Sequence, residues 1–275
     1  MRLAPWGPCL FACLSAAAAE PLTRSEQAVV NFGFATQLGS GVYSLSGRTL
    51  QVYRLPFEWT LPFEGTEQVR YRLTLPVTVG FLDFRPGDVL QTGLPQHLDS
   101  YGVVPGVEVD LRVRERWLLQ PYAQAGIARD ASLDVDQRVY AFGLRSYYDF
   151  GRGATQWQQY DELARVVVEQ RPDGPRDDLT RLRVGLTARR PLRPAEATNQ
   201  ADVLGYAFVD AYTDAPGGPA GASGDRSAPP QYEVGFTLGA TQGLRIWKLP
   251  VPRLGFGYRF GDGLEVYRLV IGSPY

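Results

Sequence analysis

Cysteine, histidine and lysine are almost missing from the 275 residues. Both cysteines, Cys9 and Cys13, lie at the N-terminus, His97 is the only histidine, and Lys248 is the only lysine. Without further cysteines, the rest of the chain cannot form disulfides or a thiolate metal site. We therefore expect its stability to come from the fold alone, with no metal and no cofactor.

An excess of charge of either sign is also missing, because 28 Lys and Arg residues face 29 Asp and Glu residues, giving a net charge of -1. Nucleic-acid binding requires an uncompensated basic surface. Apolar runs of roughly 18 residues, which a membrane-spanning helix needs, are missing beyond the N-terminus. These absences argue against a nucleic-acid partner and against a helical membrane protein.

The N-terminus has the three parts of a secretory signal peptide. A positive start at Met1–Arg2 precedes an apolar stretch over 3–14 and a run of small residues, Ala16–Ala19. We expect residues 1–19 to be cleaved, leaving a single domain over 20–275. The alternative is a lipoprotein cleavage box ending at Cys13, which Phe11 fits poorly.

Strict alternation is the most informative feature of the remaining chain. In the segment Val69–Phe81, every odd residue is apolar or aromatic and every even one is polar, small or proline. A strand places successive side chains on opposite faces, so one face of this strand is apolar. The segment is longer than the roughly 5 or 6 residues usual for soluble proteins and the roughly 9 to 11 that cross a bilayer.

The pattern recurs along the chain. Other alternating segments lie at 53–61, 107–114, 117–127, 140–150 and 232–238. Such strands form either a soluble sandwich or barrel with the apolar face inside, or a membrane barrel with that face outside. Strand length and the export signal favour an all-β fold, a transmembrane antiparallel up-and-down β-barrel of about 12 strands. A soluble periplasmic β-protein remains the alternative.

The twelve expected strands lie near 29–38, 49–61, 67–82, 103–114, 117–128, 137–150, 159–170, 179–190, 202–213, 231–240, 244–260 and 264–275. Two of these regions, 155–170 and 24–38, also fit a helical spacing. An even count places both chain ends on the periplasmic side. The long connections 83–102 and 214–230 are then extracellular, whereas 62–66, 115–116 and 241–243 are short periplasmic turns.

Charged side chains of a membrane barrel face its lumen, where they pair and stay hydrated. The lumen-facing candidates are Arg54, Arg70, Arg72, Glu108, Asp110, Arg112 and Glu233.

The last segment contains an Asp-Gly turn between two alternating strands, a strong hairpin signal. Tyr267, Leu269, Ile271 and Tyr275 share one face of its second strand. This resembles the C-terminal assembly signal of bacterial outer-membrane barrels, from which Ser273 and Pro274 depart.

Together with the segments Leu119–Ile127 and Gly255–Gly261, the chain resembles the solitary autotransporter-type β-barrel family of Gram-negative bacteria. The resemblance implies twelve strands, no secreted passenger and a location in the bacterial outer membrane. It also implies that outer-membrane lipid and the barrel-assembly machinery, which reads the C-terminal strand, are partners. The family supplies no established activity, and the sequence indicates no surface partner.

Residues for catalysis or metal binding are sparse. His97 precedes Asp99 and Ser100, but adjacent residues do not build a catalytic triad. Asp130, Asp134 and Asp136 could recruit calcium, but their spacing matches no EF-hand loop. We interpret these three residues, and the pair 177–178, as polar loop positions.

We therefore expect a monomeric, non-enzymatic outer-membrane barrel that resembles a passenger-less autotransporter translocator and serves envelope structure or surface contact. A porin-like channel for small solutes, a loop-based outer-membrane hydrolase that uses His97, and a soluble periplasmic β-protein are the alternatives.

Overall fold

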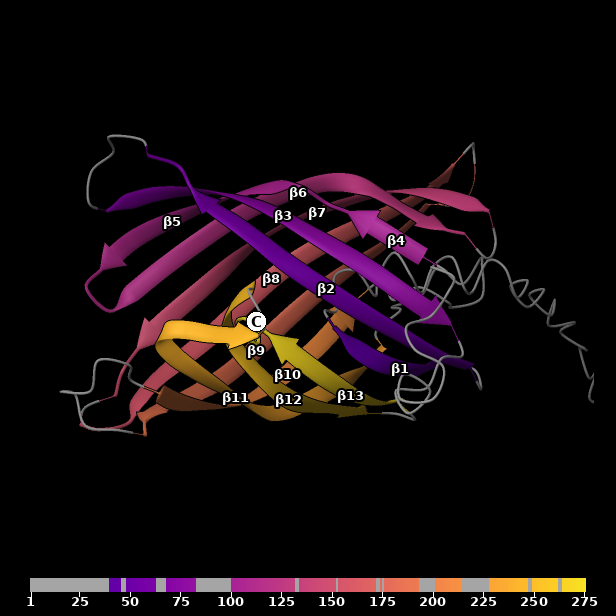
Figure 1. The fold of residues 1–275 in the computed structure, drawn as a ribbon. Coiled ribbons are helices and arrows are strands. Elements are labelled where there is room, and N and C mark those ends of the chain that lie inside the picture. The colour runs from indigo at the N-terminus through magenta and orange to yellow at the C-terminus, as the bar shows by residue number, and fades with distance from the viewer. Residues whose placement is uncertain are drawn as a thin grey trace, which may run out of the picture.

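A computed structural model describes residues 40–45, 48–62, 68–82, 100–131, 134–151, 153–171, 174, 176–192, 201–213, 228–246, 249–261 and 264–275. These residues form thirteen strands in one antiparallel sheet (Figure 1). The strands are β1 (Gly41–Leu45), β2 (Arg48–Thr60), β3 (Val69–Leu82), β4 (Ser100–Val103), β5 (Gly106–Arg114), β6 (Trp117–Asp130), β7 (Val135–Asp149), β8 (Gln156–Arg171), β9 (Arg176–Pro191), β10 (Ala201–Thr213), β11 (Ala228–Ile246), β12 (Leu249–Gly261) and β13 (Leu264–Ile271).

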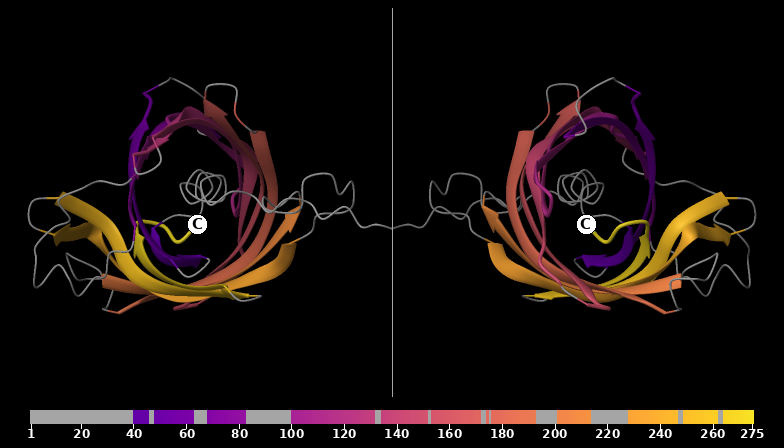
Figure 2. Two further views of the ribbon diagram at one scale, coloured as in Figure 1. Left: turned by 90° about the vertical axis from the view of Figure 1, so that its right-hand side faces the viewer. Right: turned by 90° about the vertical axis from the view of Figure 1, so that its left-hand side faces the viewer.

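Each strand pairs with its neighbour in sequence, except that β4 and β5 both pair with β3 and β6, and β1 pairs with β13 through Val42 with Tyr267 and Tyr43 with Val266. This last pairing closes the chain of hydrogen-bonded neighbours into a ring, which is visible along its axis in Figure 2. The predicted transmembrane up-and-down barrel is therefore confirmed. The part of the chain that the structure describes holds no helix long and apolar enough to cross a membrane.

Strands β4 and β5 share one position in the ring, since both lie between β3 and β6. They are separated at Val104–Pro105, because Pro105 has no N–H to donate to the ladder. The Val104 N–H still donates to the Pro76 carbonyl at 3.2 Å, and Pro105 accepts from the Ala125 N–H at 2.9 Å. Thirteen strands thus occupy twelve positions, which is the number expected, although β1 (Gly41–Leu45) is not among the strands that the sequence predicts.

The sheet has its apolar face outside and its polar face inside, the reverse of the arrangement in a soluble protein. Large apolar side chains are exposed on the outside, including Phe142 (52%), Phe236 (47%) and Val234 (46%). Inside, polar and charged side chains such as Glu233 and Arg259 are both 0% exposed. The soluble alternative requires an apolar centre with charges outside, and the described strands have the reverse arrangement.

Several expected elements differ from the structure. The helical alternative for 155–170 is wrong, because β8 pairs with β7 and β9 along its whole length. The turn expected at 241–243 is also wrong, since β11 continues to Ile246 with a register irregularity between Gly239 and Leu244. The expected strand at 29–38, the helical alternative at 24–38 and the signal peptide lie outside the described residues.

The last strand is shorter than expected, ending at Ile271 and not at Tyr275. Gly272 has a φ of 88°, in the left-handed region that favours glycine. Its N–H donates to the Arg253 carbonyl at 2.9 Å. The backbone therefore leaves the wall of the barrel at Gly272, and Figure 2 shows the end of the chain inside the ring.

Candidate functional site: the interior of the barrel

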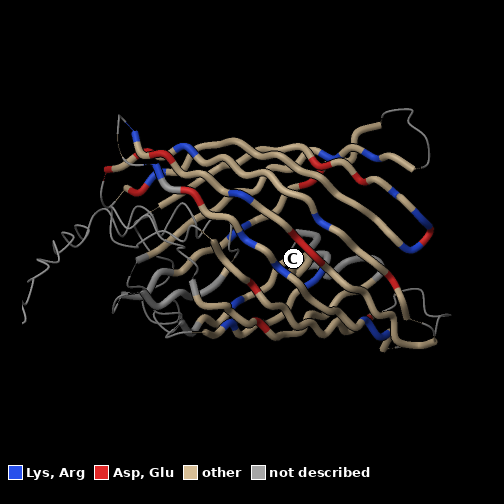
Figure 3. The backbone as a smooth tube through the Cα atoms, turned by 180° about the vertical axis from the view of Figure 1, so that it is seen from behind, with Lys and Arg blue, Asp and Glu red and all other residues tan. Residues whose placement is uncertain are grey.

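Inward-facing arginines and carboxylates are spread over many strands, because every second residue of a strand faces the lumen. Figure 3 shows charged residues of both signs interspersed along the middle of the strands as well as at their ends. The described side chains form two larger groups of ion pairs inside the barrel, the first from β2 to β9 and the second from β9 to β13, and a smaller group in which Asp202 pairs with Arg189 and Arg253.

Arg145 on β7 is the centre of the first group, which also contains Glu108 and Glu162. Its Nη1 donates to Glu108 at 2.8 Å, and its Nε donates to Glu162 at 3.1 Å. Glu162 accepts a further bond from the Tyr122 hydroxyl at 2.9 Å and pairs with Arg181. The Arg145 guanidinium lies over the Tyr122 ring, 4.1 Å from its centroid, an arrangement that adds a cation–π attraction.

Arg72 on β3 extends this first group toward one end of the barrel. Its guanidinium lies 2.8 Å from Asp110, 3.1 Å from Glu58 and 3.5 Å from Glu108. The Arg72 side chain is 23% exposed. Three carboxylates therefore neutralise this one arginine.

The second group is more deeply buried and centres on Asp210 and Glu233. Arg183 forms a two-pronged pair with Asp210 at 2.7 and 2.8 Å, the strong geometry that guanidinium and carboxylate groups favour. Arg259 lies 2.8 Å from Asp210 and 3.0 Å from Glu233, and Arg268 contacts Glu233 as well. Removing charges from water is costly unless they are paired, and here three arginines share two carboxylates, so that every charge has an oppositely charged neighbour.

A cluster of aromatic side chains fills the interior beside these ion pairs. Tyr275 stacks on Tyr160 with ring centroids 4.6 Å apart, and it contacts Tyr147 and Phe208 edge to face. Tyr160 is 0% and Phe208 is 2% exposed. Burial raises the pKa of the Tyr275 phenol, so the phenol stays protonated and donates to Gln158 at 2.9 Å.

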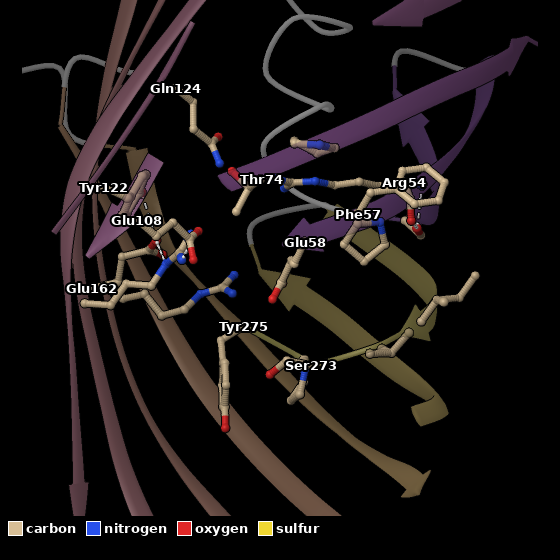
Figure 4. A pocket seen from close by; sticks show the side chains of 18 of the residues that line it. Arg54, Phe57, Glu58, Thr74, Glu108, Tyr122, Gln124, Glu162, Ser273 and Tyr275 are labelled. Carbon is tan, nitrogen blue, oxygen red and sulfur yellow. Dashed lines mark hydrogen bonds and ion pairs between the residues drawn. The ribbon is translucent and has the colours of Figure 1, made fainter. Parts of the chain in front are cut away.

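Two cavities remain in the interior. The smaller, about 130 Å³, is lined by Arg54, Thr74, Gln124 and Arg181 among others. Figure 4 shows the labelled side chains of Arg54, Thr74 and Gln124 converging on it from β2, β3 and β6. The larger, about 710 Å³, borders the turn between β5 and β6. Glu58, Glu108, Arg145 and Tyr275 line both cavities, which are therefore adjacent.

The structure brings together most of the lumen-facing candidates. Arg72, Glu108 and Asp110 belong to the first group of ion pairs, and Glu233 to the second. Arg54 lines the smaller cavity and Arg112 the larger one. Arg70 is exposed on β3 and lines neither cavity.

Sequence reasoning missed several interior residues. They include Arg145, Glu162, Arg181, Arg183, Asp210, Arg259 and Arg268, together with the aromatic cluster. A usable signal was present in β10, where Leu204, Tyr206 and Phe208 make the inward face as apolar as the outward one. This pattern is typical of a strand buried on both sides.

The residues of the expected assembly signal are divided between two faces. Tyr267 is 66% exposed on the outside of β13, and Leu269 and Ile271 are partly exposed on the same face. Tyr275 lies inside the barrel instead. The expectation that all four share a face is wrong, because the chain turns inward at Gly272.

The other candidate residues lie at the ends of the strands. Asp134 and Asp136 pair with Arg129 at 2.6 and 2.9 Å, and Asp178 pairs with Arg165. Among the described side chains, no three His, Cys, Asp or Glu residues gather as metal ligands. His97 lies outside the described residues.

Comparisons with known proteins identify the fold. No protein-family model matches the chain, and no curated protein matches its sequence. The crystal structure of the β domain of the Bordetella autotransporter BrkA is similar, with a TM-score of 0.51 and 13% identity, over 84% of this chain and 95% of that domain. The structure of Pseudomonas aeruginosa OccK11 aligns over 84% of this chain and 91% of its own, at 11% identity and a TM-score of 0.21.

The match to BrkA means that the chain has the fold of an autotransporter β domain, a transmembrane β-barrel. The predicted resemblance to autotransporter-type barrels is thereby confirmed for the fold.

Proposed function

We propose that the chain is a non-enzymatic β-barrel of the bacterial outer membrane, with a filled interior, that serves envelope structure or surface contact. The supporting observation is the burial of charged residues inside the barrel, where Glu233 and Arg259 are 0% and Asp210 is 1% exposed. A diffusion pore keeps its lumen groups in contact with water. Full burial and mutual pairing of these charges therefore favour a closed barrel.

Lipid is the proposed partner of the outer surface. The exposed apolar side chains lie on the outward face of most strands, where a hydrocarbon environment stabilises them. Strands of 13 to 16 residues, such as β2 and β8, exceed the roughly 9 to 11 that cross a bilayer. We place the barrel in the outer membrane on this basis and on the signal-like N-terminus.

The barrel-assembly machinery is the proposed partner of β13. Tyr267, Leu269 and Ile271 form an outward apolar row on this strand. Tyr275 reaches the interior cluster only after Gly272 has turned inward. We expect the machinery to bind β13 before that turn forms, when Tyr275 is still accessible.

Conductance in planar lipid bilayers tests the proposed closed state. We expect the purified barrel to insert without discrete current steps, and a shift in gel mobility on boiling shows that the inserted protein is folded. Discrete steps from folded protein would contradict the proposal.

A channel for small solutes is the second candidate, and the cavity of about 710 Å³ favours it. This cavity is lined by Arg72, Arg112 and Arg114. A channel through it would give current steps whose size or ion selectivity changes in Arg72→Gln. Steps that are identical in this variant and in the parent would exclude conduction through the arginine-lined cavity.

A further inference from the structure

Arg54, which lines the smaller cavity, has no carboxylate within ion-pair distance among the described residues. Around the smaller cavity and the two groups of ion pairs there are seven arginines, Arg54, Arg72, Arg145, Arg181, Arg183, Arg259 and Arg268, and six carboxylates, Glu58, Glu108, Asp110, Glu162, Asp210 and Glu233. Every arginine except Arg54 contacts at least one of these carboxylates. Arg54 is therefore the one arginine of this set without an ion-pair contact.

The carboxylates that line the smaller cavity together with Arg54 are already engaged. Glu108 pairs with Arg145 at 2.8 Å, Glu162 pairs with Arg145 and Arg181, and Glu58 pairs with Arg72 at 3.1 Å. Arg54 lies within electrostatic range of the like charges on Arg145 and Arg181 and of the opposite charge on Glu162, which those two arginines already bind. The cavity is lined by five arginines and three glutamates, and charges interact more strongly inside a protein than in water, so this lining favours a bound anion.

Groups with unused hydrogen-bonding capacity line the same cavity. The Thr74 hydroxyl, the Gln124 side-chain carbonyl and the Arg181 Nε are buried without a hydrogen-bond partner among the described residues. The Thr74 hydroxyl and the Arg181 Nε–H are donors, whereas the unpartnered Gln124 oxygen is an acceptor. Buried polar groups usually find partners, so the two donors suit a ligand that accepts hydrogen bonds.

Figure 4 shows Arg54, Thr74 and Gln124 pointing toward one another across the cavity, with Glu108, Tyr122 and Glu162 on one side and Tyr275 below. The volume of about 130 Å³ exceeds the roughly 10 to 15 Å³ that one water requires on a comparable measure. A ligand of a few heavy atoms therefore fits. Guanidinium groups bind carboxylate and phosphate oxygens in a two-pronged geometry.

We propose that Arg54, with Thr74, Gln124 and Arg181, binds a small oxyanion, a carboxylate or a phosphate group, inside the barrel. Arg54 neutralises the ligand charge, the Thr74 hydroxyl and the Arg181 Nε–H donate to its remaining oxygens, and the Gln124 side chain lines the cavity beside them. This site goes beyond the proposed structural role and does not depend on whether the barrel conducts.

Titration calorimetry on the refolded barrel in detergent tests the site, with sodium acetate and inorganic phosphate as separate probes and acetamide as the neutral probe. We expect saturable one-site binding of at least one oxyanion and no binding of acetamide. Acetate binding alone identifies a carboxylate site, and phosphate binding alone identifies a phosphate site. Absence of saturable binding by both would overturn the proposal.

Variants distinguish binding at this site from general screening of charges by the added salt. Arg54→Gln is expected to weaken binding at least tenfold, and Thr74→Val to weaken it several-fold without changing the net charge. The matched control is Arg70→Gln, which removes the same charge from an exposed position that does not line the cavity. Equal affinities for Arg54→Gln, Arg70→Gln and the parent would overturn the proposal.

A stability measurement shows whether the Arg54→Gln variant is still folded. Because Arg54 makes no ion-pair contact, we expect Arg54→Gln to unfold at about the same urea concentration as the parent in buffer without oxyanions. Added acetate or phosphate should raise the unfolding midpoint of the parent and of Arg70→Gln but not of Arg54→Gln. The same rise in all three proteins would contradict the assigned site.

Discussion

Glu233→Gln removes one negative charge from the centre of the barrel with little change in side-chain size. Glu233 is 0% exposed, pairs with Arg259 at 3.0 Å, contacts Arg268, and lies 3.9 Å from Arg183. In the variant, Asp210 is left as the carboxylate that Arg183 and Arg259 share. Removing one partner of a buried ion pair costs about 3 to 5 kcal/mol, because the remaining charge stays buried.

The matched control is Glu169→Gln, the same substitution near the end of β8. Glu169 lies 3.5 Å from Arg176, and their side chains are 31% and 63% exposed. Pairs in this environment contribute about 0 to 1 kcal/mol. Because both variants lose one carboxylate, the difference between them isolates the effect of burial.

Urea unfolding of the barrel in lipid vesicles supplies the free energies, followed by tryptophan fluorescence and by the fraction of protein whose gel mobility changes on boiling. We expect Glu233→Gln to lose at least about 2 kcal/mol more than Glu169→Gln. Losses within about 1 kcal/mol of each other would refute the reasoning. They would mean that water reaches Glu233 and screens its partners, so that the interior is not filled.

Further predictions concern the aromatic cluster, the outer face and one close approach of the backbone. Tyr275→Ala should lower the unfolding free energy by about 2 to 4 kcal/mol, because it removes the ring stacked on Tyr160, and a loss below about 1 kcal/mol would contradict this packing. Phe236→Arg on the outer face should cost about 2 to 4 kcal/mol in vesicles if it faces lipid; an unchanged urea midpoint would oppose that. Gly255→Ala should cost about 1 to 3 kcal/mol in the same assay, because its Cβ would overlap the Phe236 carbonyl, whereas Gly205→Ala meets no atom within 4 Å and should be near neutral. Equal effects of the two alanine variants would show that this contact is absent.

The strands and their orientation could be predicted because both depend on local pattern. Alternation over Val69–Phe81 places Thr74 and Thr78 inside and Tyr71 and Leu73 outside, as the structure has them. A two-residue period leaves only two choices of face, and strand length then favoured the membrane arrangement.

The partners inside the barrel could not be predicted in this way. Arg259 and Asp210 are 49 residues apart, and Arg145 and Glu108 are 37 apart. Their meeting depends on the curvature of the closed sheet and on the rotamers of long side chains, neither of which appears in a periodic pattern. The inward turn of Tyr275 likewise depends on the φ of a single residue, Gly272.

The central claim is that the apolar face of the barrel contacts lipid while its charged face encloses the interior. Since Cys9 and Cys13 are the only cysteines, single cysteines for spin labels can be introduced on β5 once residues 1–19 are absent. The positions are Val107 and Val113, exposed on the apolar face, and Arg112 and Arg114, which line the larger cavity.

Collision rates of these labels with oxygen, which concentrates in hydrocarbon, and with a water-soluble nickel chelate are measured in lipid vesicles. We expect oxygen to dominate at Val107 and Val113 and the chelate to dominate at Arg112 and Arg114. The account would be contradicted if neither reagent reached the labels at Val107 and Val113, or if the chelate collided with them more often than oxygen did.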